Sequence, residues 1–295
     1  MCNLAPVAIC VYSRVHHLRR TIDALKQNYL AEKSELYLFS DGPKPGDEDK
    51  VNLLRQYLYT IDGFKKVHIL ERDINNRVKN CRGGLKKVLN LHGRIIMLEE
   101  DIVTAPGFLS YINNALDYYE TNLKVVSVSG FAPPLKSLGK NDKDYFTLPR
   151  FNGWGVGMWK RSLDMVPDDL SGIDLKRIRK KLNRGGNDIY HMALLDKRGK
   201  IDALDVRIMV LMAINNMVSI YPKHSLVQNI GHDGSGVHCG SSAKFDHEAL
   251  WDKTVNFQFT PDIAPDAILL GENYKFRAVS RVRVLLRNIK YKFFK

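Results

Sequence analysis

Residues 95–101 read Ile-Ile-Met-Leu-Glu-Glu-Asp, an apolar run that ends in three consecutive carboxylates. The apolar part predicts a buried strand. In the next segment, residues 102–107, Thr104 can act as a helix N-cap and Pro106 suits a first turn, so we expect a helix to follow. Acidic triplets are usually solvated charge. At the end of a central strand of an open α/β sheet, however, carboxylates repel one another unless a cation lies between them, which predicts a divalent metal site.

Strand and helix signals alternate on both sides of this stretch. We expect strands at residues 7–12, 36–39, 67–70, 95–98 and 125–128, and helices at residues 18–29, 48–59, 80–91 and 108–119. Repeated βα units predict an α/β fold with a mostly parallel central sheet flanked by helices.

The pattern changes after Gly130. We expect a polar loop at residues 131–150, helix at 187–217 with an interruption around Gly199, and short strands at 218–221 and 225–230. The segment from Tyr274 onward is expected to be a separate basic tail.

Composition sets the broad class of the protein. The chain has 295 residues, of which 44% are hydrophobic and 26% charged, enough for one large α/β domain or two smaller ones. No apolar run approaches the ~20 residues of a transmembrane helix. Residues 4–12 lack a basic leading segment, so we interpret them as a first strand and not as a signal peptide. The scattered cysteines without CxxC spacing, and the absence of N-x-S/T sequons, favour a reducing cytosol.

The net charge of +13 is concentrated in two places. Residues 273–295 hold eight Lys/Arg and no acid, and a second basic cluster lies at Lys176–Arg184. Within the tail, an apolar stripe at helical spacing is formed by Val279, Val282, Leu286, Ile289 and Phe293. With the cations beside it, this stripe predicts an amphipathic helix that binds an anionic membrane surface. The alternatives are a helix packed back on the domain and a disordered basic tail. No RNP, KH, helix-turn-helix or zinc-finger pattern occurs, so nucleic acid is not an expected partner.

Several motifs follow one another in a fixed order over residues 5–240. They are Tyr12-Ser13-Arg14, Phe39-Ser40-Asp41-Gly42, Glu99-Glu100-Asp101 with Pro106-Gly107-Phe108 behind it, Gly153-Trp154-Gly155, and the run from Asn229 to His238. Together they resemble a GT-A-fold glycosyltransferase, in particular the N-acetylglucosaminyltransferase I type, whose acidic triplet is Glu-Asp-Asp, and related bacterial transferases for surface polysaccharides. The sequence departs from that triplet at Glu100, which leaves Asp101 as the expected metal ligand.

The resemblance implies an inverting enzyme that moves a hexosyl or N-acetylhexosaminyl group, N-acetylglucosamine being one candidate. The donor would be a UDP-sugar, the cofactor Mn²⁺ or Mg²⁺, and the acceptor a saccharide or a lipid-linked saccharide. Residues 1–130 would form the nucleotide-sugar-binding half and 131–272 the acceptor-side half of one catalytic domain. The basic amphipathic tail, residues 273–295, would hold the protein peripherally on the inner face of the cell membrane. The alternatives are a protein that binds nucleic acid or an anionic surface, and a catalytically inactive carbohydrate-binding relative.

The donor site is expected to gather residues from several strand ends. By resemblance, Arg14 and Asp41 would lie in the nucleotide pocket, although Ser-Asp-Gly-Pro is also an ordinary turn signal. Arg82, followed by two glycines, would open a helix whose N-terminus favours phosphate. Glu99 and Glu100 would contact ribose, the sugar or water near the metal.

The acceptor side needs a base that takes the proton of the attacking hydroxyl. The related transferases carry an Asp before an Arg at about this distance after Gly-Trp-Gly, which points to Asp205, with Arg207 contacting the acceptor or a neighbouring loop. Asp202 competes for this role, and it would otherwise be a helix N-cap.

The roles of His238 and Trp154 have two interpretations each. His238 is expected to contact the metal or phosphate, the alternative being a loop histidine without a role. Trp154 is expected beside a sugar ring, whereas we expect Trp159 in the core.

Overall fold

The computed structural model describes residues 4–140, 142–234, 250 and 256–280. Its main sheet has the strand order β3-β2-β1-β4-β8-β6-β9-β7. The strands are β1 (Val7–Val11), β2 (Glu35–Ser40), β3 (Lys66–Glu71), β4 (Arg94–Glu99), β6 (Val125–Ser129), β7 (Tyr145–Leu148), β8 (Val156–Trp159) and β9 (Val218–Pro222). A second, two-stranded sheet pairs β5 (Ile102–Thr104) with β10 (Val227–Asn229).

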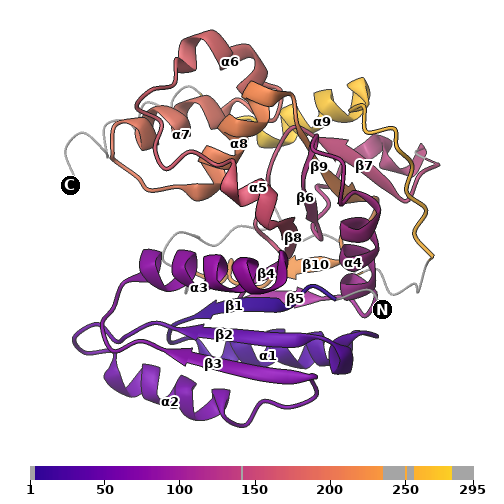
Figure 1. Cartoon of the computed structure of the whole chain (residues 1–295). Helices are drawn as coiled ribbons and strands as arrows, with labels where there is room; N and C mark the ends of the chain where they lie inside the picture. Colours follow the sequence, from indigo (N-terminus) through magenta and orange to yellow (C-terminus); the bar gives the residue numbers. More distant parts are fainter. Residues whose placement is uncertain (1–3, 141, 235–249, 251–255, 281–295) are drawn as a thin grey trace.

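The helices cover this sheet on both faces (Figure 1). They are α1 (Val15–Lys26), α2 (Glu48–Leu58), α3 (Arg77–His92), α4 (Phe108–Tyr118), α5 (Lys160–Asp164), α6 (Leu175–Asn183), α7 (Asp188–Lys197), α8 (Leu204–Asn215) and α9 (Ala267–Arg277), with short 3₁₀ turns η1 (Ala31–Lys33) and η2 (Lys136–Lys140).

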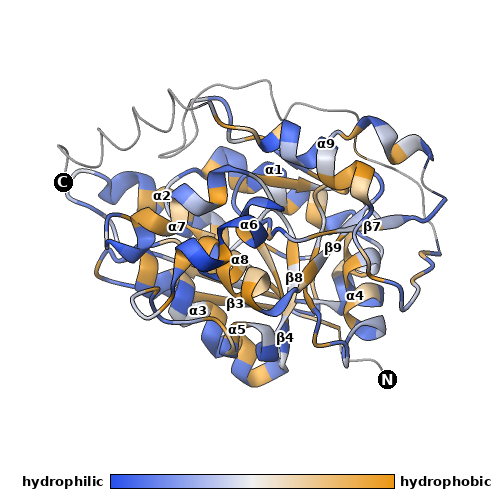
Figure 2. Ribbon diagram, turned by 90° about the horizontal axis from the view of Figure 1, so that it is seen from above, coloured by the Kyte–Doolittle hydropathy of each residue, from blue (hydrophilic) through white to orange (hydrophobic). Residues whose placement is uncertain are grey.

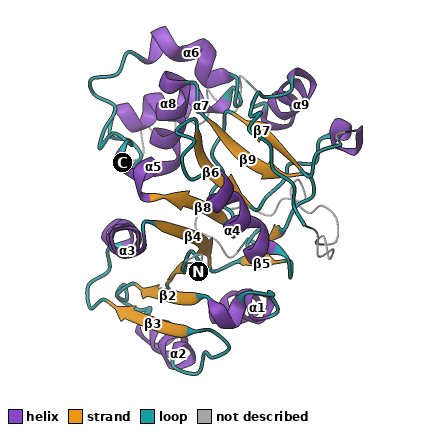
Figure 3. Cartoon of the chain, turned by 45° about the vertical axis from the view of Figure 1, so that its right-hand side comes forward, coloured by secondary structure: helices purple, strands orange, loops and turns teal. Residues whose placement is uncertain are grey.

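Side-chain alternation along the strands explains the layering. Ile9 points into the core beneath α1 and α2, whereas Ala8 packs with Val88 of α3 on the opposite face. Figure 3 shows α3 separated from α1 and α2 by the strands. Strands β1 to β4 run parallel, while β8 lies antiparallel between β4 and β6. The predicted α/β class with a large, mostly parallel sheet is confirmed.

Two expected helix starts are wrong. Thr104 is not an N-cap, because it belongs to β5 and pairs with Val227 of β10, and α4 begins at Phe108 after Gly107. The helix expected from residue 80 begins at Arg77, where the side chain of Asn76 accepts a hydrogen bond from the Lys79 N–H (2.9 Å). The two glycines after Arg82 therefore lie inside α3 and not at its N-terminus.

The polar loop expected at residues 131–150 contains η2 and β7. The basic cluster at Lys176–Arg184 lies largely in the helix α6, which the sequence analysis did not predict.

Helix α9, the last of the described helices, continues past residue 272 to Arg277, so the first part of the expected tail belongs to the folded domain. Asn273 is fully buried and donates to the Gly185 carbonyl (3.1 Å), while the Glu272 carboxylate accepts two hydrogen bonds from Ser137. Residues 281–295, and with them most of the predicted apolar stripe, lie outside the described residues. Among the helices that the structure does describe, none combines the length and the apolar character that crossing a membrane requires.

One arginine holds the junction between α4 and β6. The Arg161 guanidinium donates to the carbonyls of Tyr119, Glu120, Asn122 and Val125 at 3.0–3.2 Å and stacks over the Trp159 ring at 4.2 Å. It thus satisfies carbonyls that the end of a helix leaves unpaired.

Candidate active site

The acidic triplet lies at the carboxyl end of β4, beside the end of β1. Strand pairing places Glu99 opposite Cys10, and Arg14 follows as the N-cap residue of α1. The Arg14 guanidinium donates to Glu100 Oε1 at 2.9 and 2.7 Å and to Asp101 Oδ2 at 2.7 Å. The structure therefore brings together the first and third sequence motifs, whose arginine and carboxylates lie more than 80 residues apart in the chain.

Two polar atoms in this cluster are buried and have no hydrogen-bond partner among the described residues, namely Asp101 Oδ1 and Arg14 Nη1. Such atoms are costly unless something binds them. An ionised carboxylate oxygen only accepts, so it suits a cation, whereas a guanidinium N–H suits an anion.

The residues present fit a divalent cation that is bound in part by substrate. The described residues contain no group of three or more His, Cys, Asp or Glu side chains that could surround a metal alone. Mg²⁺-type sites often use one or two carboxylates and take their other ligands from substrate phosphates and water. Asp101 can supply such a carboxylate.

Glu99 differs from its neighbours in its electrostatics. Its side chain reaches solvent, but the protein packed around it desolvates the carboxylate, and Asp101 and Glu100 add two nearby negative charges. Desolvation first, and then these charges, raise the pKa of Glu99 to about 7.

The loop after β10 closes over Asp101. The Ile230 N–H donates to the Asp101 carbonyl (2.9 Å), and a Cβ at Gly231 would lie 2.0 Å from Asp101 Oδ2. Only glycine therefore fits this position without displacing the carboxylate. Further along the loop, a hydrogen bond of 3.0 Å joins His17 Nε2 and Asp233 Oδ2.

Trp154 lies next to this loop. It is half-buried, and its ring meets His232 edge-on at 5.5 Å and Phe131 at 5.0 Å. Trp159 is in the core as predicted, with its indole N–H bound to the Leu116 carbonyl (3.2 Å). His238 lies outside the described residues.

Asp41 is buried and bonded within the chain. Its carboxylate accepts hydrogen bonds from the backbone N–H groups of Gly42 and Asn76 and from the Asn75 amide. Asp41 therefore fixes the turn that leads into α3. Its expected contact with a nucleotide remains a prediction.

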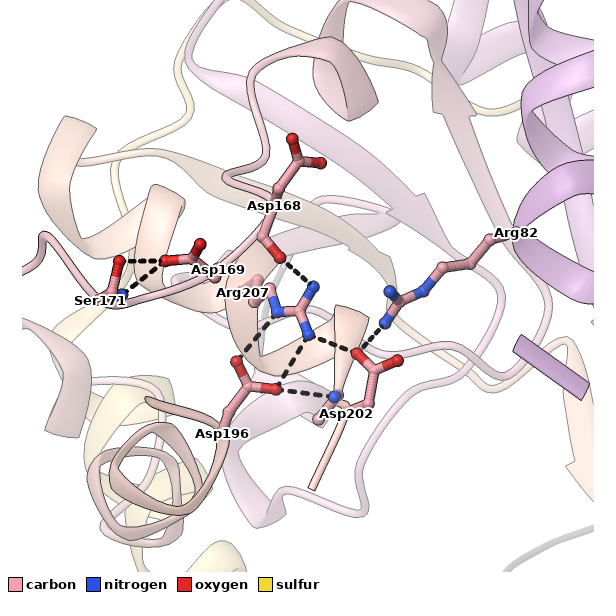
Figure 4. Close-up of polar contacts among 8 residues, drawn as sticks. Arg82, Asp168, Asp169, Ser171, Asp196, Asp202 and Arg207 are labelled. Carbon is pink, nitrogen blue, oxygen red and sulfur yellow. Dashed lines mark hydrogen bonds and ion pairs between the residues drawn. The ribbon is translucent and has the colours of Figure 1, made fainter. Parts of the chain in front are cut away.

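Arg82 reaches across to the loop before α8 (Figure 4). It forms an ion pair with Asp202, which also pairs with Arg207. Arg207 in turn binds Asp196 (2.9 Å) and the Asp168 carbonyl (2.5 Å). Arg207 is only 9% exposed, and it holds the α7–α8 connection together. Its bond to the Asp168 carbonyl is the predicted contact with a neighbouring loop, and contact with an acceptor remains a prediction. The expected alternative role of Asp202 as an N-cap is wrong, because Ala203 occupies that position.

Asp205 has a different environment. It lies in the first turn of α8, is exposed, and pairs with no cation of the described residues. Its side chain reaches solvent, but the protein packed around it desolvates the carboxylate and raises the pKa of Asp205, while the Val206 N–H and the nearby charge of Arg150 act in the opposite direction. A carboxylate that is accessible, unpaired and raised in pKa suits a general base better than one held by two arginines.

The sequence analysis missed Arg150. This side chain is 8% exposed and binds Asp188 through two bonds of 2.9 and 2.8 Å. Its position between Pro149 and Phe151, in otherwise apolar surroundings, was the available signal.

Comparisons with known proteins complete the description. No family model matches the chain, and no curated protein matches it either. Similar solved structures include the mannosyltransferase PcManGT from Pyrobaculum calidifontis in complex with GDP-Man and Mn²⁺, which is 14% identical with a TM-score of 0.42 over 71% of this chain and 68% of that one. Another is S. aureus TarS, 10% identical with a TM-score of 0.38 over 74% of this chain. The aligned region spans 36% of the TarS chain. Neither likeness carries an argument about activity, so function is argued from the residues of this chain.

Proposed function

We propose that this protein is a metal-dependent, inverting glycosyltransferase. It would move a sugar from a nucleoside diphosphate sugar, with UDP as the expected nucleotide, to a saccharide or lipid-linked saccharide. The observation that carries the proposal is the pair of buried, unsatisfied atoms Asp101 Oδ1 and Arg14 Nη1. They belong to two side chains that are bonded to each other through Arg14 Nη2 and Asp101 Oδ2 (2.7 Å) at the end of a central strand. A site that offers one acceptor and one donor suits a cation together with a phosphate.

On the donor side, Asp101 would hold the metal and Arg14 would bind a diphosphate oxygen through Nη1. A divalent cation bound there supplies positive charge that neutralises the departing diphosphate. Glu99 and Glu100 would contact ribose, the sugar or water, and Trp154 would pack against a sugar ring. Asp41 and His238 retain their proposed places near the nucleotide and the phosphate.

On the acceptor side, Asp205 would take the proton of the acceptor hydroxyl. The hydroxyl oxygen then bonds to C1 of the donor sugar while the C1–O bond to the diphosphate breaks, which inverts the configuration at C1. The charge of Arg150 favours the ionised form of Asp205, which is the form that can accept a proton.

Arg82 has a place between these two sides. Its partner Asp202 precedes Asp205 by three residues, so the pair links α3 to the start of α8. We propose that Arg82 lies at the rim of the donor site, where this link fixes the distance between donor and base.

The test is ligand-dependent thermal unfolding of the full chain, followed by a donor-hydrolysis screen. UDP with Mn²⁺ is expected to raise Tm, whereas either one alone or UDP in EDTA is expected to raise it less. Asp101→Asn should remove the Mn²⁺-dependent part while keeping the Tm of the unliganded protein. Stabilisation by UDP that is unchanged in EDTA and in the variant would refute the metal assignment.

The screen compares UDP-, GDP- and dTDP-sugars with and without Mn²⁺. Hydrolysis or transfer of any of them supports catalysis. Binding with no turnover of any donor would identify the chain as an inactive carbohydrate-binding relative.

A further inference from the structure

The helix α6 carries one of the highest densities of positive charge in the chain. Five cations lie within its nine residues and a sixth follows at its C-cap: Lys176, Arg177, Arg179, Lys180, Lys181 and Arg184. All six are exposed, while Leu175 and Leu182 on the other side are buried against the core around α7 and α8. Figure 2 shows α6 as a strongly hydrophilic helix facing outward over α8.

No acid of the part of the chain that the structure describes neutralises these cations. None of the six forms an ion pair with an acid of the described residues; Arg179 instead lies 4.9 Å above the buried Tyr190 ring. The nearest acid in the sequence, Asp174, is the N-cap, and it accepts the backbone N–H groups of Lys176 and Arg177.

This arrangement lowers the stability of the helix. Lys176 and Lys180, like Arg177 and Lys181, are like charges four residues apart, which disfavours a helix. Lys176 and Arg177 also lie in the first turn, where the helix dipole favours acids. Local rules are broken in this way mainly where a function compensates for them.

The surface continues beyond α6. Helix α7 packs on α6 and ends at Lys197, which is followed by Arg198 and Lys200. The two acids of α7 do not offset these charges, because Asp188 pairs with Arg150 and Asp196 with Arg207.

The last described residues of the chain, up to Ser280, lie against the loop between α6 and α7. Asn187, which caps α7 a few residues after α6, binds the backbone of Val279 through its side chain, at 2.9 Å to the N–H and 3.2 Å to the carbonyl. The sequence that follows Ser280 contains six more Lys/Arg and no acid.

We propose that the exposed face of α6 is a docking surface for an anionic membrane. A row of unpaired cations on one solvent-facing helix is complementary to a layer of lipid phosphates, and each Lys or Arg near such a layer strengthens partitioning by about fivefold. Nucleic acid is the less suitable partner, because single strands need exposed aromatic platforms and Tyr190 is 8% exposed. The apolar and aromatic residues interleaved with cations in the sequence after Ser280 also favour lipid. This inference does not depend on the proposed transfer activity.

The experiment measures partitioning of the full chain to phosphatidylcholine vesicles with roughly 30% phosphatidylserine and to vesicles of phosphatidylcholine alone. The variant Lys176/Arg177/Lys180/Lys181→Gln removes four charges of α6 and keeps residues of good helix propensity. The matched control, Lys33/Lys66/Lys86/Lys87→Gln, removes the same charge from exposed lysines without ion pairs on the other half of the molecule.

Wild type and control are expected to bind the anionic vesicles, and the α6 variant to bind at least tenfold more weakly at low salt. Equal losses in both variants would reveal a net-charge effect and overturn the proposal, as would an α6 variant that binds like wild type. Tighter binding of wild type to duplex RNA than to vesicles at equal phosphate concentration would overturn it in favour of nucleic acid. If the α6 variant fails to unfold cooperatively, Arg179/Arg184→Gln replaces it with Lys86/Lys87→Gln as the control that removes the same charge, and the same outcomes apply.

Discussion

Replacing Asp205 with Asn tests the proposed base against its closest competitor. Asparagine keeps the size of the side chain but cannot accept a proton at neutral pH. Loss of a general base typically slows a reaction by about 10²–10⁴-fold. That range corresponds to roughly 2.7–5.5 kcal/mol of transition-state stabilisation. Because Asp205 is exposed and pairs with no cation of the described residues, we expect its removal to change the free energy of unfolding by less than about 1 kcal/mol.

The control, Asp202→Asn, should behave in the opposite way. Asp202 pairs with Arg82 and Arg207, and its side chain is 42% exposed. Partly exposed pairs contribute about 0–1 kcal/mol each, so we expect the variant to lose up to about 2 kcal/mol of stability. Its transfer rate should fall by no more than about tenfold, because the carboxylate of Asp205 is retained and only the ion pairs that position it are weakened.

The assay combines transfer rates, donor binding and urea unfolding for wild type and both variants. Asp205→Asn should bind the donor as wild type does and lose transfer, because Asp205 does not contact the diphosphate in our proposal. An inactive Asp202→Asn beside a normal Asp205→Asn would show that the assignment of the base is wrong. Loss of donor binding in Asp205→Asn would show that this carboxylate belongs to the donor site.

Three further substitutions test the structure around the site. Gly231→Ala is expected to abolish Mn²⁺-dependent UDP binding, because its Cβ would lie 2.0 Å from Asp101 Oδ2. The control Gly83→Ala has open space at its Cβ and should bind normally. Equal binding by both variants in a thermal-shift titration would contradict the packing argument. Arg161→Ala should lower the free energy of unfolding by about 2–4 kcal/mol in urea, because it leaves four carbonyls, three of them in partly buried hydrogen bonds, without this partner and uncovers Trp159. A loss below about 0.5 kcal/mol would rule out that role. Burial would raise the pKa of Asp188, but the hydrogen bonds and charge of Arg150 outweigh it and lower that pKa. The Asp188–Arg150 pair therefore stabilises the protein fully above the unfolded pKa of about 3.9 and loses this effect as pH falls through the lower folded pKa. Asp188→Asn should accordingly lower the free energy of unfolding at pH 7 and lower it progressively less toward pH 2. A difference from wild type that does not change with pH would refute the linkage.

The sequence predicted the elements whose signals are local. The apolar run at residues 95–98 became β4, and the predicted helix at residues 48–59 became α2, with boundaries shifted by one residue. Such elements depend on periodic burial of their own side chains, which the sequence shows directly.

Elements that depend on distant partners were missed. β5 is three residues long and is a strand because it pairs with β10, more than 120 residues later. The start of α3 is similar, because Asn76 is held by the Asp41 carboxylate from the end of β2. The turn chemistry at Asp41 was visible in the sequence, but the residue it binds was not.

The candidate site shows the same division. The sequence identified the carboxylates by their position after a strand, and it identified Arg14, Asp202 and Asp205 as candidates. It could not tell which of the two aspartates was engaged, because the partners of Asp202 come from α3 and α8. Charge pairing across the fold, and not residue type, separates a structural aspartate from an available one.

That pairing also bears on how the two halves of the chain work together. Arg82 lies in the half expected to bind the nucleotide, and Asp202 lies in the half expected to bind the acceptor. Arg207 then joins Asp202 to Asp196 near the end of α7, and Asp205 lies in the first turn of the next helix. In our proposal the base is therefore connected to the donor half through a chain of ion pairs, which would hold it in position before any substrate binds. Because the rate of transfer between two bound substrates depends on their relative placement, this link would add to the proposed transfer rate without touching either substrate, by the loss of up to about tenfold expected for Asp202→Asn.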